Sequence, residues 1–194
     1  LSVSLLGRSP LAIRLVAALL GILTVPAVYL MARELLGRWE ALLTAFVTAT
    51  TFWHLNLSRV GFRTVSLPLL IALCLWLFAR GLRTKHWYDF VLGGFCLGLS
   101  LYTYLAARFV PVVFLGLVAY WLWRRQPINW RGLFLFFTVA LIVALPLLIY
   151  AAQHLDTFLE RSAQVSIFNP TINQGDFAST LLRHLGRTLG MFNW

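Results

Sequence analysis

The chain has 194 residues, of which 60% are hydrophobic and only 11% are charged, and its formal net charge is +10. The mean hydropathy of +0.82 excludes an ordinary soluble domain, in which about half of the residues are apolar and about a quarter are charged. The basic residues separate apolar runs and do not form a patch, which argues against a nucleic-acid-binding protein. The composition therefore predicts a polytopic membrane protein.

Six uncharged runs follow one another at regular lengths. They are residues 15–32, 41–58, 64–79, 90–107, 109–123 and 132–155. A membrane helix needs about 20 mostly apolar residues, and its backbone polar groups must be satisfied internally. Strands of a membrane barrel would be half as long and would alternate. We therefore expect an all-α fold with about six spans, at residues 11–32, 40–57, 64–82, 88–106, 109–124 and 132–153.

The basic residues of the short loops predict how the spans are oriented, because cytoplasmic loops carry an excess of Lys and Arg. One alternate set of loops contains Arg33, Arg38, Arg80, Arg83, Lys85, Arg124, Arg125 and Arg131. The other set contains Arg8, Arg59, Arg63 and Arg108. The richer set is expected to be cytoplasmic, so the chain would start and end on the extracytoplasmic side.

The spans also carry packing motifs. Gly94 and Gly98 have GxxxG spacing, which allows two helices to approach closely. We interpret this motif as packing inside one bundle. We read residues 1–153 as that bundle.

Residues 154–194 form an amphipathic tail, expected on the extracytoplasmic side. Residues 157–160 have the spacing of a capping box, and a further helix is expected to start at Asp176. Its apolar stripe would consist of Leu181, Leu182, Leu185, Leu189 and Phe192. Arg183, His184 and Arg187 would lie elsewhere on that helix, and helices of this kind commonly lie in the membrane interface.

The most polar break between two apolar runs, residues 53–63, contains Arg59 and Arg63. If the local helix persists, residues four apart share one face. Two guanidinium groups on one face can donate paired hydrogen bonds to a phosphate. Two cations at one short outer turn oppose the positive-inside bias, which favours a binding role over anchoring.

Further candidates for a substrate or lipid-phosphate site accompany the two arginines. His54 and Asn56 lie in the same break, and Tyr102, Tyr104 and Arg108 lie at the next outer turn. For any single arginine, an alternative is that it only snorkels to lipid headgroups. His54 by itself is better explained as a polar residue at the interface, and nothing local supports a role as catalytic base.

The sequence offers no convincing catalytic acid or base. Acid–base catalysis usually needs a positioned carboxylate or a similar group. On the outer side the acidic residues are Asp156, Glu160 and Asp176, which fit helix-start chemistry. Cys74 and Cys96 fall inside apolar runs, so we expect no metal centre and no cofactor, although the sequence alone does not exclude a divalent ion.

Several segments together resemble a known family. They are Gly7-Arg8-Ser9-Pro10, residues 14–15, 18–21 and 29–38, Ser58-Arg59 with Arg63, residues 93–99, and Tyr102-Thr103-Tyr104. This pattern resembles membrane glycosyltransferases of the GT-C superfamily. It is most similar to the bacterial branch related to protein O-mannosyltransferases and to the aminoarabinose transferase of lipid A. The resemblance extends to about residue 150.

The resemblance implies a multi-pass enzyme of the bacterial plasma membrane that takes a sugar from a polyprenyl-phosphate donor. Its acceptor is undefined, and no nucleic acid is involved. In such enzymes the catalytic Asp lies in the first large outer loop, so we expect it upstream of Leu1 and read the chain as a fragment. Many relatives have a lysine where this chain has Tyr104; Arg108, one turn later, could replace that charge.

Two alternatives from other classes stay open. A transporter or flippase for an anionic or lipid-linked substrate would use the same arginines for binding alone. Transporter sites lie near the bilayer midplane and often accompany internal repeats, whereas this sequence shows no repeat and has nearly uncharged span centres. A scaffold subunit without chemistry is the third reading.

Overall fold

The structure is a computed structural model that describes residues 10–60, 63–125, 129–154 and 177–190. Within these ranges the regular elements are all helical, which confirms the predicted all-α class. The chain divides into two compact units, residues 1–145 and residues 146–194. Each unit is described below by itself.

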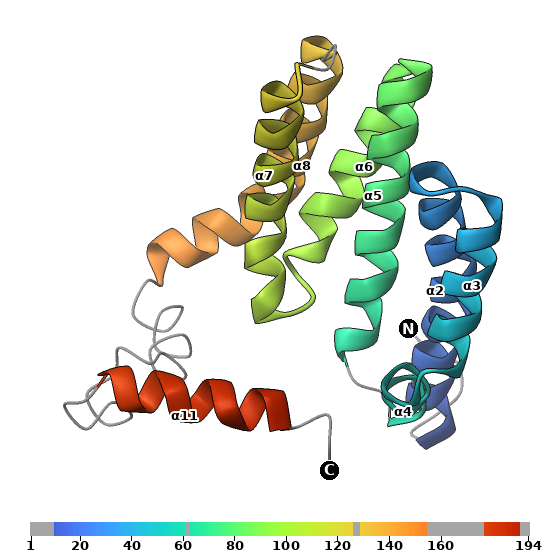
Figure 1. Cartoon of the computed structure of the whole chain (residues 1–194). Helices are drawn as coiled ribbons and strands as arrows, with labels where there is room; N and C mark the ends of the chain where they lie inside the picture. The colour runs from blue at the N-terminus through green and yellow to red at the C-terminus, as the bar shows by residue number, and fades with distance from the viewer. Residues whose placement is uncertain (1–9, 61–62, 126–128, 155–176, 191–194) are drawn as a thin grey trace. The chain divides into compact units, whose positions relative to one another are not determined.

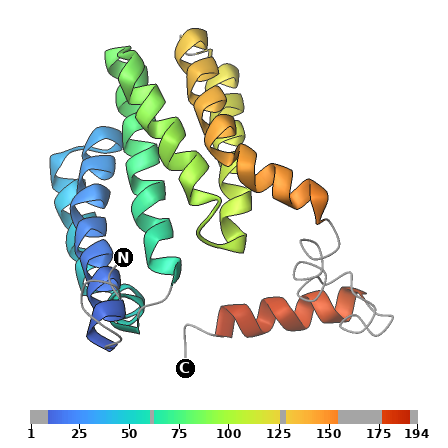
Figure 2. The same cartoon turned by 180° about the vertical axis from the view of Figure 1, so that it is seen from behind.

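The helices of the first unit are joined by short connections, and successive long helices run in opposite directions (Figure 1). They are α2 (Pro10–Leu35), α3 (Arg38–Thr50), α4 (Phe52–Val60), η1 (Arg63–Val65), α5 (Ser66–Thr84), α6 (Trp87–Ser100), η2 (Leu105–Phe109), α7 (Val110–Trp123) and α8 (Trp130–Gln153), the last of which continues into the second unit. Figures 1 and 2 place α4, η1 and η2 at one end of this unit, which we call the α4 end. The α5–α6 turn, the end of α7 and the start of α8 lie at the opposite end.

Four helical segments are long and apolar enough to cross a membrane. They are Arg14–Leu35, Ser66–Thr84, Ala106–Trp123 and Trp130–Gln153. These segments correspond to four of the six predicted spans and confirm a polytopic membrane protein. Six crossings stay a prediction.

The other two predicted spans differ from the structure. The span expected at 40–57 is interrupted at Thr51, whose ψ of 125° is extended, so that α3 and α4 are separate helices. Hydroxyl groups explain the break: Thr48 and Thr51 donate to the carbonyls of Thr44 and Val47, respectively, and such bonds compete with regular helix. The span expected at 88–106 contains α6, whose 14 residues extend about 21 Å, less than the hydrocarbon thickness of about 30 Å.

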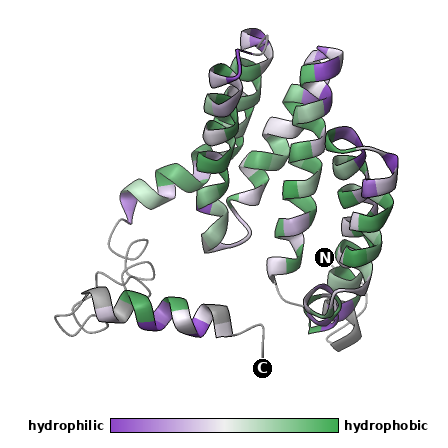
Figure 3. Ribbon diagram, viewed as in Figure 1, coloured by the Kyte–Doolittle hydropathy of each residue, from purple (hydrophilic) through white to green (hydrophobic). Residues whose placement is uncertain are grey.

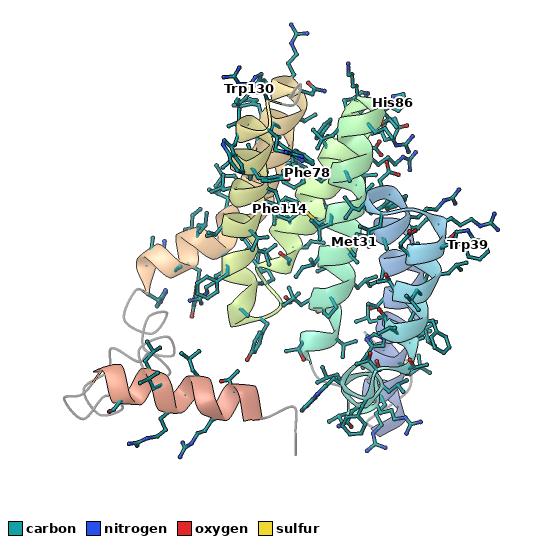
Figure 4. The ribbon with its side chains drawn as sticks, in the orientation of Figure 1. Met31, Trp39, Phe78, His86, Phe114 and Trp130 are labelled. Atoms are coloured by element: carbon teal, nitrogen blue, oxygen red, sulfur yellow. The ribbon has the colours of Figure 1, made fainter. Side chains whose placement is uncertain are left out.

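An aromatic cluster holds three helices of the first unit together. Phe78 of α5 lies with its ring centroid 5.2 Å from that of Phe114 of α7 and 4.8 Å from that of Phe136 of α8. All three side chains are at most 1% exposed. Figure 4 shows Phe78 and Phe114 lying close together between their helices. Edge-to-face and tilted aromatic pairs add to the free energy of burial, so this cluster is the core of the unit.

Glycines bring α6 close to α8. A Cβ atom on Gly98 would lie 2.6 Å from Val143 Cβ and 2.8 Å from the carbonyl oxygen of Ala140. One on Gly94 would collide with the backbone carbonyl of Phe136. The interpretation of the GxxxG motif as packing inside one bundle is therefore confirmed.

The opposite end of the unit contains a buried carboxylate. Asp89, in the first turn of α6, is 1% exposed. Its Oδ2 accepts a hydrogen bond of 3.0 Å from the hydroxyl of Thr84 and lies 3.6 Å from Nε of Arg80. Arg83 of α5 forms a second ion pair, with Glu34 of α2. Arg80 and Arg83 are therefore neutralised by carboxylates from neighbouring helices.

Gly98→Ala should destabilise the protein, because the added methyl group forces α6 away from α8. Overpacking of this kind costs about 1–3 kcal/mol, which corresponds to a melting temperature lower by about 2–12 °C. The measurement is thermal unfolding in detergent. Gly116→Ala is the matched control, since a Cβ on Gly116 meets nothing within 4 Å. Equal melting temperatures for the two variants would contradict the close α6–α8 contact.

Asp89→Ala should also lower the stability, by about 1–3 kcal/mol, because it leaves the half-buried Arg80 without its carboxylate and removes the hydrogen bond between Thr84 and Asp89. Arg83→Gln removes an ion pair whose arginine is 67% exposed, so its effect should stay below about 1 kcal/mol. Chemical or thermal unfolding in the same detergent compares the two variants. An Asp89→Ala protein as stable as Arg83→Gln would show that the buried pair contributes little.

Candidate functional site

The polar helix α4 is attached to the membrane helix α2 at one closely packed point. Nε2 of His54 lies 3.1 Å from the carbonyl oxygen of Gly21. The hydroxyl of Ser58 donates to the His54 carbonyl at 2.6 Å. A Cβ on Gly21 would lie only 2.8 Å from Ser58 Cβ and closer still to its hydroxyl oxygen. Only glycine at position 21 lets α4 approach α2 in this way.

This attachment determines where Arg59 lies. Arg59 is in the last turn of α4, one residue after Ser58, and its side chain is exposed. Asn56, one turn earlier in α4, is exposed as well. A cation in the last turn interacts favourably with the helix dipole, so Arg59 is compatible with its helix and still faces outward.

Arg63 differs from the expectation. The spacing of Arg59 and Arg63 suggested one continuous helical face, but α4 ends at Val60 and Arg63 begins η1. The two arginines therefore belong to separate elements. Gly61 lies between them in the sequence, and glycine is among the least favourable residues in a helix. The side chain of Arg63 lies outside the described part of the structure.

The second group of candidates lies where α6 passes into η2. Tyr102 donates a hydrogen bond of 2.8 Å from its hydroxyl to the carbonyl oxygen of Val143 in α8. Tyr104 has an extended backbone and a side chain that is 53% exposed. Arg108 follows in the last turn of η2 and is half-buried. The tyrosine–α8 bond connects this turn to the bundle.

The structure places both groups at the α4 end of the unit, as the alternating loops predicted (Figures 1 and 2). Their described hydrogen bonds connect each group to a different helix: His54 to α2 and Tyr102 to α8. The structure thus brings the candidates to one end. It does not show one side-chain cluster that contains them all.

The charges of the two ends differ. At the opposite end, Arg80 and Arg83 pair with Asp89 and Glu34. Residues 51–66 and 100–110, which make up the α4 end, contain three arginines and no carboxylate. An excess of guanidinium groups beside tyrosine and histidine suits an anion, above all a phosphate.

The described residues contain no group of three or more His, Cys, Asp or Glu side chains that could hold a metal ion. The tail carboxylates Asp156, Glu160 and Asp176, together with the predicted capping box, lie outside the described residues.

Sequence reasoning missed two residues that the structure makes prominent. Gly21 is one of many small residues in an apolar helix, and nothing local distinguishes it. Asp89 could have been found, because an acidic residue at the start of an apolar run is costly unless it has a partner. Its partners, Arg80 and Thr84, come from the preceding helix.

Comparisons with known proteins bear on the whole bundle. Searches of curated proteins and of solved structures found no match. The sequence model of a family described as dolichyl-phosphate-mannose-protein mannosyltransferase matches residues 1–150. The match includes every candidate residue of the α4 end and confirms the resemblance to membrane glycosyltransferases. The chain belongs to the dolichyl-phosphate-mannose-protein mannosyltransferase family and is a multi-pass integral membrane protein.

Proposed function

We propose that the chain forms part of a GT-C type glycosyltransferase in a bacterial plasma membrane. It would transfer a sugar from a polyprenyl-phosphate donor to an acceptor on the extracytoplasmic side. The family match supports glycosyl transfer in general. The observation that carries the donor assignment is the α4 end, whose sequence supplies three arginines without a carboxylate.

The proposed role of the arginines follows from the charge that develops during transfer. When the bond between the sugar and the phosphate breaks, the phosphate leaves with additional negative charge. Donors that are already in place stabilise this charge more effectively than donors that must move. Arg59 meets this condition because the contact of His54 with the Gly21 carbonyl and the close packing of Ser58 on Gly21 hold α4 against α2.

The second group would complete the phosphate site. Arg108 supplies a further guanidinium. Tyr104, whose side chain is 53% exposed, stands where the resemblance implies a lysine in many similar enzymes. Since guanidinium groups supply the positive charge, the proposal includes no metal ion or cofactor. Tyr102 would keep this turn in position through its bond to α8.

The exposed apolar surface of α7 could bind the lipid part of the donor. Helix α7 follows directly after Arg108, and its Val112 and Val113 are about 60% exposed. A polyprenyl chain whose phosphate lies at Arg108 could extend along this apolar surface into the bilayer. The phosphate would then lie among the lipid headgroups, and the polyprenyl chain would lie in the hydrocarbon beside α7.

Arg59→Ala and Arg63→Ala should each lower sugar transfer by about 10²–10³-fold, because each removes a donor to the developing charge. The assay measures transfer from polyprenyl-phosphate mannose, and then from other polyprenyl-phosphate sugars, by the full-length protein that contains this chain, in liposomes. Arg38→Ala, an exposed arginine in the first turn of α3, is the control and should retain full activity.

Full activity in both site variants would rule out the arginine site. Tight binding of the donor without transfer, for every sugar tested, would favour the transporter class. Unfolding temperatures equal to that of the unmodified protein would show that loss of activity is not loss of folding.

Gly21→Ala should weaken the use of donor, because its methyl group displaces Ser58 and moves Arg59 with it. A misplacement of about 1 Å can cost about 10²-fold in rate, so we expect kcat/KM to fall by about 10- to 100-fold. Gly116→Ala should have no effect. In Gly21→Ala/Ser58→Gly the colliding atoms are absent, so partial recovery is expected. A fully active Gly21→Ala protein would show that the α2–α4 contact does not position the site.

A further inference from the structure

Helix α11 (Phe177–Gly190) belongs to the second unit and has two distinct sides. At 3.6 residues per turn, Leu181, Leu182 and Leu185 lie on one side. Arg183 and Arg187, which are one turn apart, lie on the other. In Figure 3, hydrophobic and hydrophilic residues alternate along the ribbon of α11.

The apolar side is exposed. Leu182 is 69% exposed, Leu185 50% and Leu181 39%. Three neighbouring leucines in contact with solvent are an unusual surface for a folded protein, and such surfaces commonly mark an interaction site. Burial of these leucines against an apolar phase would be favourable.

The length and charge of α11 indicate that the apolar phase that buries its leucines is the interface of a membrane. Fourteen residues extend about 21 Å, too short to cross hydrocarbon about 30 Å thick. The helix contains Arg183, His184 and Arg187 and no Asp or Glu. A short helix with a leucine side and a polar side whose charged residues are all basic matches an interfacial helix on an anionic surface.

The position of α11 in the chain also supports binding to a membrane surface. It follows α8, a candidate membrane span that ends at Gln153. The chain between Gln153 and Phe177 therefore tethers α11 to a membrane, which raises the effective concentration of lipid around it. A soluble partner would have to compete with a surface that is always present.

We propose that α11 lies in the plane of the membrane on anionic phospholipid. Leu181, Leu182 and Leu185 insert between the acyl chains, and Arg183 and Arg187 extend to lipid phosphates. Each basic residue near an anionic surface favours binding by about fivefold, so the arginine pair contributes about 25-fold. This inference does not depend on the sugar-transfer reaction.

The test places an environment-sensitive NBD fluorophore on α11 of the whole chain in vesicles. Leu182→Cys reports the apolar side, and Ser179→Cys, outside the leucine side, is the matched position. The unmodified chain gives the background from Cys74 and Cys96, which lie within helices of the bundle. Vesicles consist of phosphatidylcholine, with or without phosphatidylglycerol.

We expect the fluorophore at position 182 to shift to shorter wavelength in vesicles with phosphatidylglycerol, and the one at position 179 to stay unshifted. Adding Arg183→Gln and Arg187→Gln, or raising the salt concentration, should reverse the shift. An equal shift in phosphatidylcholine alone would overturn the anionic-lipid assignment. The absence of a shift at position 182 in either lipid would overturn membrane docking altogether. No sugar donor is present, so the outcome is separate from that of the transferase assay.

Discussion

The hydrocarbon core of a bilayer offers no hydrogen bonds to a polypeptide, and this constraint governs the bundle. Backbone groups within the membrane must be paired inside each helix, so polar interruptions are confined to helix ends. The break at Thr51 obeys this rule, because threonine hydroxyls bond to carbonyls of the preceding turn. The short polar helix α4 can follow only because it lies at an end of the unit. That end is where lipid headgroups, and the phosphate of a lipid-linked donor, would be found.

Close packing provides what the hydrophobic effect cannot supply between helices in lipid. Gly98 lets α6 contact α8, and Gly21 lets α4 contact α2. The first contact supports the aromatic core around Phe78, whereas the second positions Arg59. Stability and the proposed donor site thus depend on the same device, which is the absence of a side chain where two helices meet.

The two ends of the first unit use arginine differently. Arg80 and Arg83 are paired with Asp89 and Glu34, which fastens neighbouring helices together. The sequence of residues 51–66 and 100–110, at the α4 end, contains three arginines and no carboxylate. We therefore place the proposed site for the anionic donor at the α4 end, where no carboxylate in the sequence would compete with the phosphate. In the proposed arrangement of α11, arginines likewise bind phosphate, in this case that of the membrane lipids.

The sequence by itself determined the helical membrane class, four of the spans, the two-sided pattern of α11 and the family. These properties depend on local hydropathy and period, which a single segment reveals. Only the tertiary structure decided that α3 and α4 separate, that Arg59 and Arg63 belong to different elements, and that Gly21 meets Ser58. It also showed that Asp89 is buried beside Arg80. The contact between Gly21 and Ser58 joins segments far apart in the chain, so no local pattern encodes it. The helix breaks arise from local threonine bonds and from a glycine, which the apolar pattern of the predicted spans does not reveal.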